Sequence, residues 1–340
     1  MRVGGISYAV DDDHHDLAWA PATVRRDLLA IRDELRCNAV MVYGRDVERL
    51  EAAGAIALEL GLDVWVQPRL AERRRRETVA HLARGAEAAE RLRVAHPGRV
   101  TFVAGCEHSL FARGLIPGPH LLVRLRMLRF ARRFRLRARI RRRLDALLGE
   151  AVEVARARFG GPVTYGAGYW EEVDWSRFDL VGVNLYRMGA DDAGYAERVR
   201  ALVRDAGKPV AITEFGCCPH RGAERSGPAG FTIVNWLASP PRVKDGAVRD
   251  EATQAAYLDE LIALYEEAGV DGAFVFTFAM PAFPHRPDDP RHDLDMASFG
   301  VVKVSPDDPH AWERKAAFDA VAARYGALAT RRRSGADTPA

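Results

Sequence analysis

The chain has 340 residues, of which 48% are hydrophobic, so it can bury the core of one barrel domain or of two smaller domains, and a single domain is expected. A net charge of +3, from 50 basic and 47 acidic residues, is small for this length and gives no reason to expect a nucleic-acid partner. The first residues form no basic and apolar leader and no apolar run is long enough to cross a bilayer, so a cytoplasmic protein without a transmembrane segment is expected.

Eight segments rich in apolar and β-branched residues are predicted as strands, at 3–8, 39–43, 62–67, 100–104, 162–167, 180–185, 210–213 and 272–278. Segments with helical periodicity alternate with them, at 25–35, 47–60, 72–94, 121–159, near Trp175, and at 193–206, 251–267 and 311–325. This alternation predicts the α/β class and a single-domain (β/α)8 TIM barrel over residues 1–328. The last residues, 329–340, are expected to form a disordered tail.

A doubly wound open sheet is the competing architecture. It would normally place a glycine-rich phosphate turn after the first strand, whereas Gly4 and Gly5 lie inside that strand and no third glycine follows. No phosphate-binding loop is visible elsewhere in the sequence. We therefore expect no cofactor.

Two loops, 11–16 and 285–295, combine histidines with several aspartates. Neither has the ligand spacing of a defined metal site, so solvated or substrate-contacting loops are favoured over metal centres. Asp295 follows the eighth strand and is a candidate substrate contact. The four cysteines have neither zinc spacing nor the density of a disulfide scaffold, which is typical of a reducing compartment.

Two glutamates follow predicted buried strands. Glu214 ends the segment 209–216, Pro-Val-Ala-Ile-Thr-Glu-Phe-Gly, and Glu107 follows the apolar run 100–104. The carboxyl ends of the strands of a barrel lie at the edge where active sites form. Two carboxylates at that edge are the minimum equipment for retaining glycoside hydrolysis, and the alternative is a pair of residues that form ion pairs at the barrel mouth.

With these two glutamates on the fourth and seventh strands, the chain resembles the clan A retaining glycoside hydrolases, which include cellulases, mannanases and β-galactosidases. The resemblance implies that Glu107 is the acid/base and Glu214 the nucleophile. It also implies that Tyr186, in a segment with Asn184 that resembles the sixth strand of the family, hydrogen-bonds the nucleophile. Arg45, after the second strand, stands where many members place an arginine beside that residue.

The sequence departs from the family pattern at two positions. Cys106 stands immediately before the expected acid/base, where the family usually has an asparagine that holds the 2-hydroxyl of the sugar, and His108 follows it. The family commonly has a tryptophan at the end of the eighth strand, and the candidates for that position here are Phe276 and Phe278. Each change removes a typical sugar contact.

Other aromatic residues could stack on the face of a sugar. Trp170, Trp236, Phe276 and Phe278 are the candidates, because flat apolar rings complement the C–H face of a pyranose. Packing in the core is the alternative interpretation for each of them.

A basic segment, 119–150, contains eleven arginines between Arg124 and Arg143, interleaved with apolar residues. Such a helix could lie on an anionic membrane surface, bind a phosphorylated partner or contact nucleic acid. A long fourth barrel helix with solvated or paired arginines is the favoured interpretation, because that helix must fall here. It leaves room for a weak contact with an anionic surface.

The sequence therefore predicts an enzyme that cleaves a small glycoside or an oligosaccharide with retention of configuration. One alternative is a barrel enzyme of natural-product metabolism that uses the same carboxylates for transglycosylation or other acid-base chemistry. Another is a non-catalytic protein that binds carbohydrate or acts in defence, since the chain also faintly resembles barrel proteins classed as abortive-infection proteins.

Overall fold

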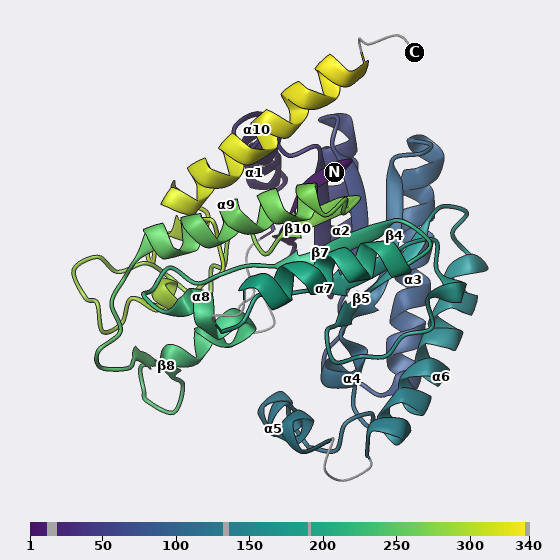
Figure 1. Ribbon diagram of the computed structural model, residues 1–340, viewed down its shortest axis with the longest axis horizontal. Coiled ribbons are helices and arrows are strands. Elements are labelled where there is room, and N and C mark those ends of the chain that lie inside the picture. Colours follow the sequence, from purple (N-terminus) through teal and green to yellow (C-terminus); the bar gives the residue numbers. More distant parts are fainter. Residues whose placement is uncertain (12–18, 132–135, 190–191, 337–340) are drawn as a thin grey trace.

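The computed structural model describes residues 1–11, 19–131, 136–189 and 192–336 (Figure 1). Its central element is a closed barrel of eight parallel strands in the order β1-β10-β7-β6-β5-β4-β3-β2, which confirms the predicted (β/α)8 TIM barrel. The strands are β1 (Val3–Ala9), β2 (Ala39–Gly44), β3 (Asp63–Pro68), β4 (Val100–Cys106), β5 (Val163–Gly168), β6 (Val181–Asn184), β7 (Val210–Phe215) and β10 (Gly272–Val275).

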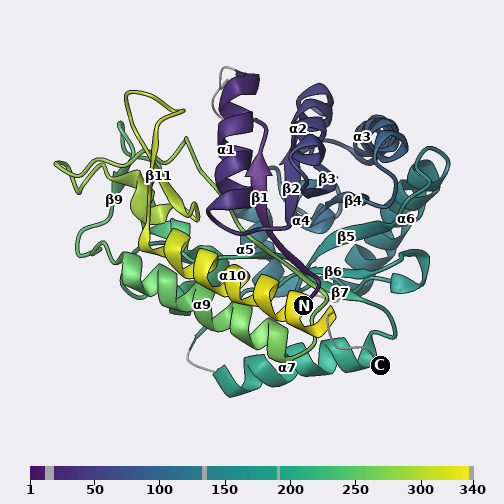
Figure 2. The same ribbon diagram turned by 90° about the horizontal axis from the view of Figure 1, so that it is seen from above.

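Helices surround the barrel on its outer side (Figure 2). They are α1 (Pro21–Asp33), α2 (Val47–Glu59), α3 (Arg75–Ala95), α6 (Leu136–Arg156), α7 (Asp192–Asp205), α9 (Glu251–Glu267) and α10 (Ala316–Ala336). Three more helices lie in the connections: α4 (His108–Phe111) and α5 (Leu121–Ala131) between β4 and α6, and α8 (Ala223–Ser226) between β7 and α9. Local sequence sets several of their ends. Pro21 begins α1, and the Asp46 side chain accepts hydrogen bonds from the first free amides of α2.

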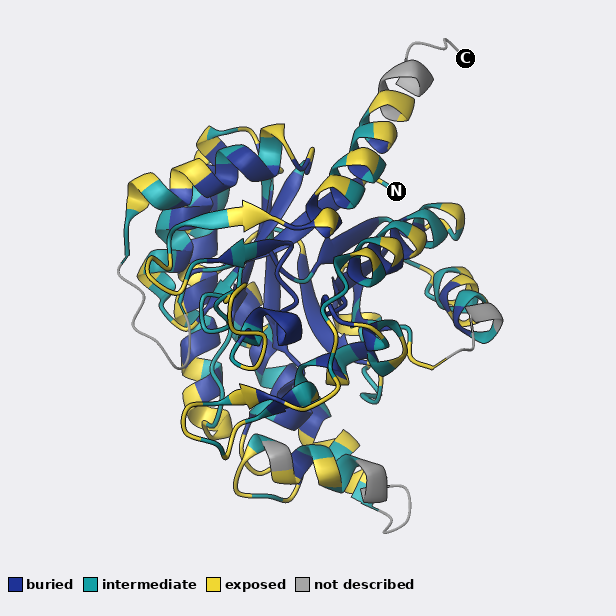
Figure 3. Ribbon diagram, turned by 90° about the vertical axis from the view of Figure 1, so that its left-hand side faces the viewer, coloured by how far each residue is buried: buried dark blue, intermediate teal, exposed yellow. Residues whose placement is uncertain are grey.

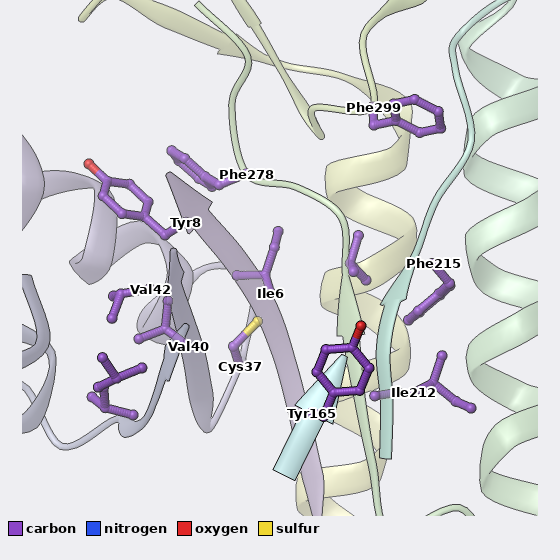
Figure 4. Close-up of a cluster of buried hydrophobic side chains, with 14 of the residues drawn as sticks. Ile6, Tyr8, Cys37, Val40, Val42, Tyr165, Ile212, Phe215, Phe278 and Phe299 are labelled. Atoms are coloured by element: carbon purple, nitrogen blue, oxygen red, sulfur yellow. The ribbon is translucent and has the colours of Figure 1, made fainter. Parts of the chain in front are cut away.

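The apolar core has two parts. The larger part lies between the strands and the helices, where Ile6, Val40 and Ile212 are fully buried (Figure 4). The smaller part fills the barrel and includes Trp65 and Phe274, whose ring centroids are 4.7 Å apart. Burial is concentrated in the strands (Figure 3), so the inside of the barrel is a packed core and not an open channel.

Two loops carry elements that sequence reasoning did not predict. The connection from β7 to α9 contains a 3₁₀ segment (Gly227–Ile233) and the hairpin β8 (Val234–Asn235) with β9 (Arg242–Val243). The connection from β10 to α10 contains another 3₁₀ turn (Leu294–Ala297) and the hairpin β11 (Val302–Val304) with β12 (Trp312–Arg314). These strands have two or three residues, too few for a hydrophobic period to show.

Several predicted boundaries differ from the structure, and the largest differences lie in two helical regions. The helical region expected over 121–159 is divided into α5 and α6, and α10 continues through residues 329–336, which were expected to begin a disordered tail. The tail residues 337–340 lie outside the described part of the chain, as do residues 12–18 of the first aspartate-rich loop. Within the described residues, no helix combines the length and the apolar character needed to cross a membrane.

Candidate active site

Glu214 lies near the end of β7 with 9% of its surface exposed. Its Oε1 accepts a hydrogen bond of 2.9 Å from the Tyr186 hydroxyl, and its Oε2 accepts one of 2.8 Å from Nη2 of Arg69. A carboxylate that accepts from a hydroxyl and a guanidinium is stabilised as an anion and held in one orientation. The contact with Tyr186 is the one that the family resemblance implied.

The arginine beside Glu214 is Arg69, which follows β3. The expectation that Arg45 lies beside the nucleophile was wrong. Arg45 is exposed, and its backbone amide donates to the Asp11 carboxylate. Nε of Arg69 donates to Oε1 of Gln67 over 2.6 Å, and its guanidinium carbon lies 4.3 Å from the centre of the Tyr43 ring. Amide, ring and carboxylate together fix the guanidinium plane.

Glu107 follows β4 at a tight turn with a left-handed backbone, at φ 42° and ψ 47°. A non-glycine residue rarely adopts this conformation, and it persists only where surrounding contacts hold it. Here the Glu107 amide donates to the Gly166 carbonyl over 2.9 Å, and the next amide, that of His108, donates to the Tyr165 hydroxyl over 2.6 Å. Both contacts come from β5, which therefore supports the turn.

Asn184, at the end of β6, connects the two glutamates. Its Nδ2 donates to Oε1 of Glu107 over 3.0 Å, while in the strand ladder Asn184 is the register partner of Glu214. Its own orientation is fixed, because the Thr213 hydroxyl donates to Oδ1 over 2.8 Å. Asn184 thus contacts Glu107 through its side chain and lies beside Glu214 in the strand ladder.

The surroundings of Glu107 favour its protonated form. Burial, followed by the negative charge of Glu214, raises the pKa of Glu107 to about 8, and the hydrogen bond from Asn184 opposes this rise. Because Oε1 accepts from Asn184, the acid proton belongs on Oε2. Glu107 can therefore donate a proton at neutral pH.

A second group of polar residues supports the Glu107 turn from the β5 side. The Tyr165 hydroxyl donates to Oε2 of Glu171 over 2.8 Å, and the Ser109 amide donates to Oε1 over 2.9 Å. The Ser109 hydroxyl also accepts from the indole of Trp170 over 3.0 Å, which anchors this sugar-stacking candidate beside the turn. Burial raises the pKa of Glu171 against these hydrogen bonds.

The structure places Cys106 and His108 differently from each other. Cys106 is buried, and Nδ2 of Asn184 donates to its sulfur over 3.2 Å, so this thiol lies within the site. The ring of His108 has its contacts elsewhere: Nε2 donates to the Ala104 carbonyl over 3.0 Å and the ring stacks on Tyr165. Burial lowers the pKa of His108 to about 4, and its predicted role as a substrate contact is wrong.

Phe278 and Phe276 also have different surroundings. Phe278 is fully buried, with its ring 6.1 Å from that of Tyr8 and 5.3 Å from that of Trp312, so the expectation that it binds substrate is wrong (Figure 4). Phe276 is partly exposed, and its ring lies 5.8 Å from that of Tyr43 and 5.6 Å from the Arg69 guanidinium. Phe276, which directly follows β10, the eighth strand of the barrel, is therefore the aromatic residue of that strand that lies at the site.

Asp295 is 1% exposed and lies in a buried ion-pair network. Its Oδ1 lies 2.7 Å from Nζ of the fully buried Lys315, and its Oδ2 accepts from Arg249 over 2.9 Å. The predicted role as a substrate contact is therefore wrong, because this carboxylate holds the loop after β10 against the start of α10. Trp236 is 46% exposed in the β8 hairpin, where its ring packs edge-on against Phe283.

Sequence reasoning missed Arg69, Gln67, Thr213, Tyr165 and Glu171. Arg69 carried the same signal as the two glutamates, since it follows an apolar strand directly. Among the described residues, no group of three or more histidine, cysteine or acidic side chains could hold a metal ion. All four cysteines are free and buried.

Comparison with known proteins supports the fold. The sequence matches no family model and no curated protein sequence. Solved structures do match: a GH113 β-1,4-mannanase (15% identity, TM-score 0.63, covering 96% of this chain and 99% of that one), a β-glucuronidase from Ruminococcus gnavus (14%, 0.58, 95% and 49%), and Cel5A from Thermotoga maritima, in complex with cellobiose (13%, 0.55, 93% and 96%).

The chain shares its fold with clan A glycoside hydrolases. The resemblance noted in the sequence is thus confirmed at the level of the barrel. At these identities the likeness extends to the fold alone, so the chemistry must be argued from the residues of this site.

Proposed function

We propose that this protein is a retaining glycoside hydrolase, with Glu107 as acid/base and Glu214 as nucleophile. The observation that carries the proposal is the opposite environment of two neighbouring buried carboxyl groups. Glu214 accepts from Arg69 and Tyr186, whereas burial and the charge of Glu214 raise the pKa of Glu107 to about 8. Such a difference between the environments of two carboxyl groups is what general-acid and nucleophilic roles require.

In the first step, Oε2 of Glu107 gives its proton to the glycosidic oxygen while Glu214 attacks the anomeric carbon. The bond between that carbon and the leaving oxygen breaks, and an ester joins the sugar to Glu214. Formation of the ester removes the negative charge of Glu214, which after burial is the largest cause of the raised Glu107 pKa. Glu107, now ionised, accepts a proton from water, whose oxygen attacks the anomeric carbon and releases Glu214.

The proposed substrate is a glycoside or an oligosaccharide. Phe276, Tyr43 and Trp170 are partly exposed aromatic rings around the two carboxyl groups and offer stacking surfaces for a pyranose. The solved structures that match include a mannanase and a β-glucuronidase, so proteins of this fold are named for action on both neutral and acidic sugars. Cys106 supplies a thiol where an asparagine would hold the 2-hydroxyl.

The test is hydrolysis of a panel of aryl glycosides, with the configuration of the first product followed by NMR. Glu214→Gln is expected to abolish turnover, and Glu107→Ala to spare only substrates whose leaving group needs no protonation. The exposed Glu313→Gln serves as the matched control. Azide added to Glu107→Ala is expected to give a glycosyl azide of retained configuration. A product of inverted configuration from the parent enzyme, or full activity of Glu214→Gln, would refute the proposal.

A further inference from the structure

The positive charge of this protein is concentrated in one segment. Eleven of its 50 basic residues lie between Arg124 and Arg143, and residues 121–144 contain no acid. The rest of the chain consequently carries more acidic than basic residues, although the net charge is +3. A positive region on an otherwise acidic molecule attracts anionic ligands.

Five arginines of this segment form one exposed surface on the first turns of α6, whereas Arg124, in α5, is buried and paired with Glu72. We call it the α6 basic surface, and it consists of Arg137, Arg139, Arg141, Arg142 and Arg143, all of which are exposed. The opposite face of the helix packs on the barrel through buried leucines such as Leu144 and Leu147. The exposed residues of these turns are arginines and Ala138, so this surface presents no large apolar side chain to a bilayer.

The α6 basic surface is attached to the loops that form the active-site edge of the barrel. Arg143 donates to the Gly114 carbonyl, in the loop after β4, and Arg141 donates to Glu172 over 3.2 Å, in the loop after β5. Glu172 directly follows Glu171, whose carboxylate accepts a hydrogen bond from the Ser109 amide beside the Glu107 turn. A chain that leaves the site past Trp170 would therefore meet these arginines.

A groove of about 490 Å³ lies on this surface, lined by Arg137, Ala138, Arg141, Arg142, Asp145 and Glu172. Its two acids pair with only part of the basic surface. Glu172 contacts Arg137 and Arg141, and Asp145 lies 3.9 Å from Arg141. Arg139 and Arg142 have no carboxylate partner among the described residues, so their guanidinium groups are available to an external anion.

We propose that the α6 basic surface is a distal subsite for an anionic polysaccharide, whose uronate or sulfate groups pair with Arg139 and Arg142 while a neighbouring unit occupies the site. This inference rests on the proposed function, since it names the substrate class of that site. Arginine forks match carboxylate and sulfate oxygens two at a time, which a solvated lysine face would not do. The attachment to the β4 and β5 loops favours a glycan over a nucleic acid, because a glycan is the polymer that the proposed chemistry cleaves.

The experiment measures binding in the Glu214→Gln background, where turnover is absent. Oligogalacturonate and a neutral manno-oligosaccharide of equal length are titrated at 50 and 200 mM salt. The double variant Arg139→Gln and Arg142→Gln is compared with a control on α7, Arg200→Gln and Arg204→Gln. We expect the first pair to weaken oligogalacturonate binding about tenfold and to reduce its salt dependence, with no effect on the neutral ligand or from the control pair.

Equal affinity for both ligands, or no effect of the α6 pair, overturns the inference. If the α6 pair weakens binding to phosphatidylserine vesicles more than binding to oligogalacturonate, the result overturns the inference in favour of a membrane contact. If it weakens binding to duplex DNA more, the result favours a nucleic acid. The two proposals fail separately. A protein that hydrolyses neutral glycosides and ignores polyanions retains the proposed function alone, whereas one that binds oligogalacturonate through α6 without hydrolysing any glycoside loses the proposed function alone.

Discussion

Removal of the Asn184 amide should shift the pH dependence of the enzyme in a defined direction. Asn184 donates to Oε1 of Glu107, and this bond favours the ionised form and so lowers the pKa of Glu107. A hydrogen bond to a charged group contributes about 1.5–3 kcal/mol, and one pKa unit corresponds to about 1.4 kcal/mol. Asn184→Ala is therefore expected to raise the Glu107 pKa from about 8 by roughly one to two units.

The assay is kcat/KM against pH with an aryl glycoside whose leaving group requires protonation, because this profile reports the ionisation of the free enzyme. Activity falls when Glu107 loses its proton, so the alkaline limb should move to higher pH. Thr213→Val, which removes only the hydroxyl that fixes the amide, should move it in the same direction by less. Asn235→Ala, in the β8 hairpin, is the matched control, since within the described part of the chain its side chain accepts only from the Leu237 amide. An alkaline limb that stays in place or moves to lower pH in Asn184→Ala refutes this account.

Three further changes test the energetics of the site. Glu107→Gln should stabilise the fold by up to about 3 kcal/mol at pH 7 in denaturant unfolding, because a carboxyl whose folded pKa is raised from 4.5 to about 8 opposes folding increasingly across that range; the gain should vanish near pH 4.5, and a gain independent of pH would contradict it. Arg69→Lys should lower kcat about a hundredfold with little change in KM, since a single ammonium nitrogen cannot occupy both positions from which Nε and Nη2 donate to Gln67 and Glu214; activity close to that of the parent would exclude the orienting role. His108→Gln should flatten the loss of stability on acidification, because a folded pKa of about 4 against 6.5 makes the native state lose stability as the pH falls through that window; an unchanged acid profile would show that another group is responsible.

Sequence could predict the barrel and its two acids because both depend on local signals. A buried parallel strand is a mainly apolar run, and its end is marked by the first charged residue, which is where Glu107 and Glu214 lie. The same logic places Arg45 and Arg69 at strand ends without deciding between them. That choice depends on the path of each loop: the Arg45 amide is fixed to Asp11, whereas Arg69 reaches across the barrel to Glu214.

The wrong substrate contacts have a common physical reason. Asp295, His108 and Phe278 all lie in or next to segments that end at the active-site edge, but position in a segment does not decide where a side chain points. Asp295 finds a partner in Lys315, twenty residues later, and His108 one in the backbone carbonyl of Ala104. Such pairings of buried polar groups are set by tertiary packing, which a single sequence does not display.

The support of Glu107 follows from the cost of its position. A left-handed backbone and an acid buried beside another carboxylate both oppose folding, so contacts elsewhere must offset them. Those contacts come from Tyr165, Asn184 and Glu171, all on β5, β6 or the loop after β5, rather than from the chain next to Glu107. The contact from Asn184 reaches the carboxyl group itself, while those with Tyr165 and Glu171 fix the backbone that follows it. That arrangement is what a proton donor requires, because its raised pKa exists only while the carboxyl group stays buried.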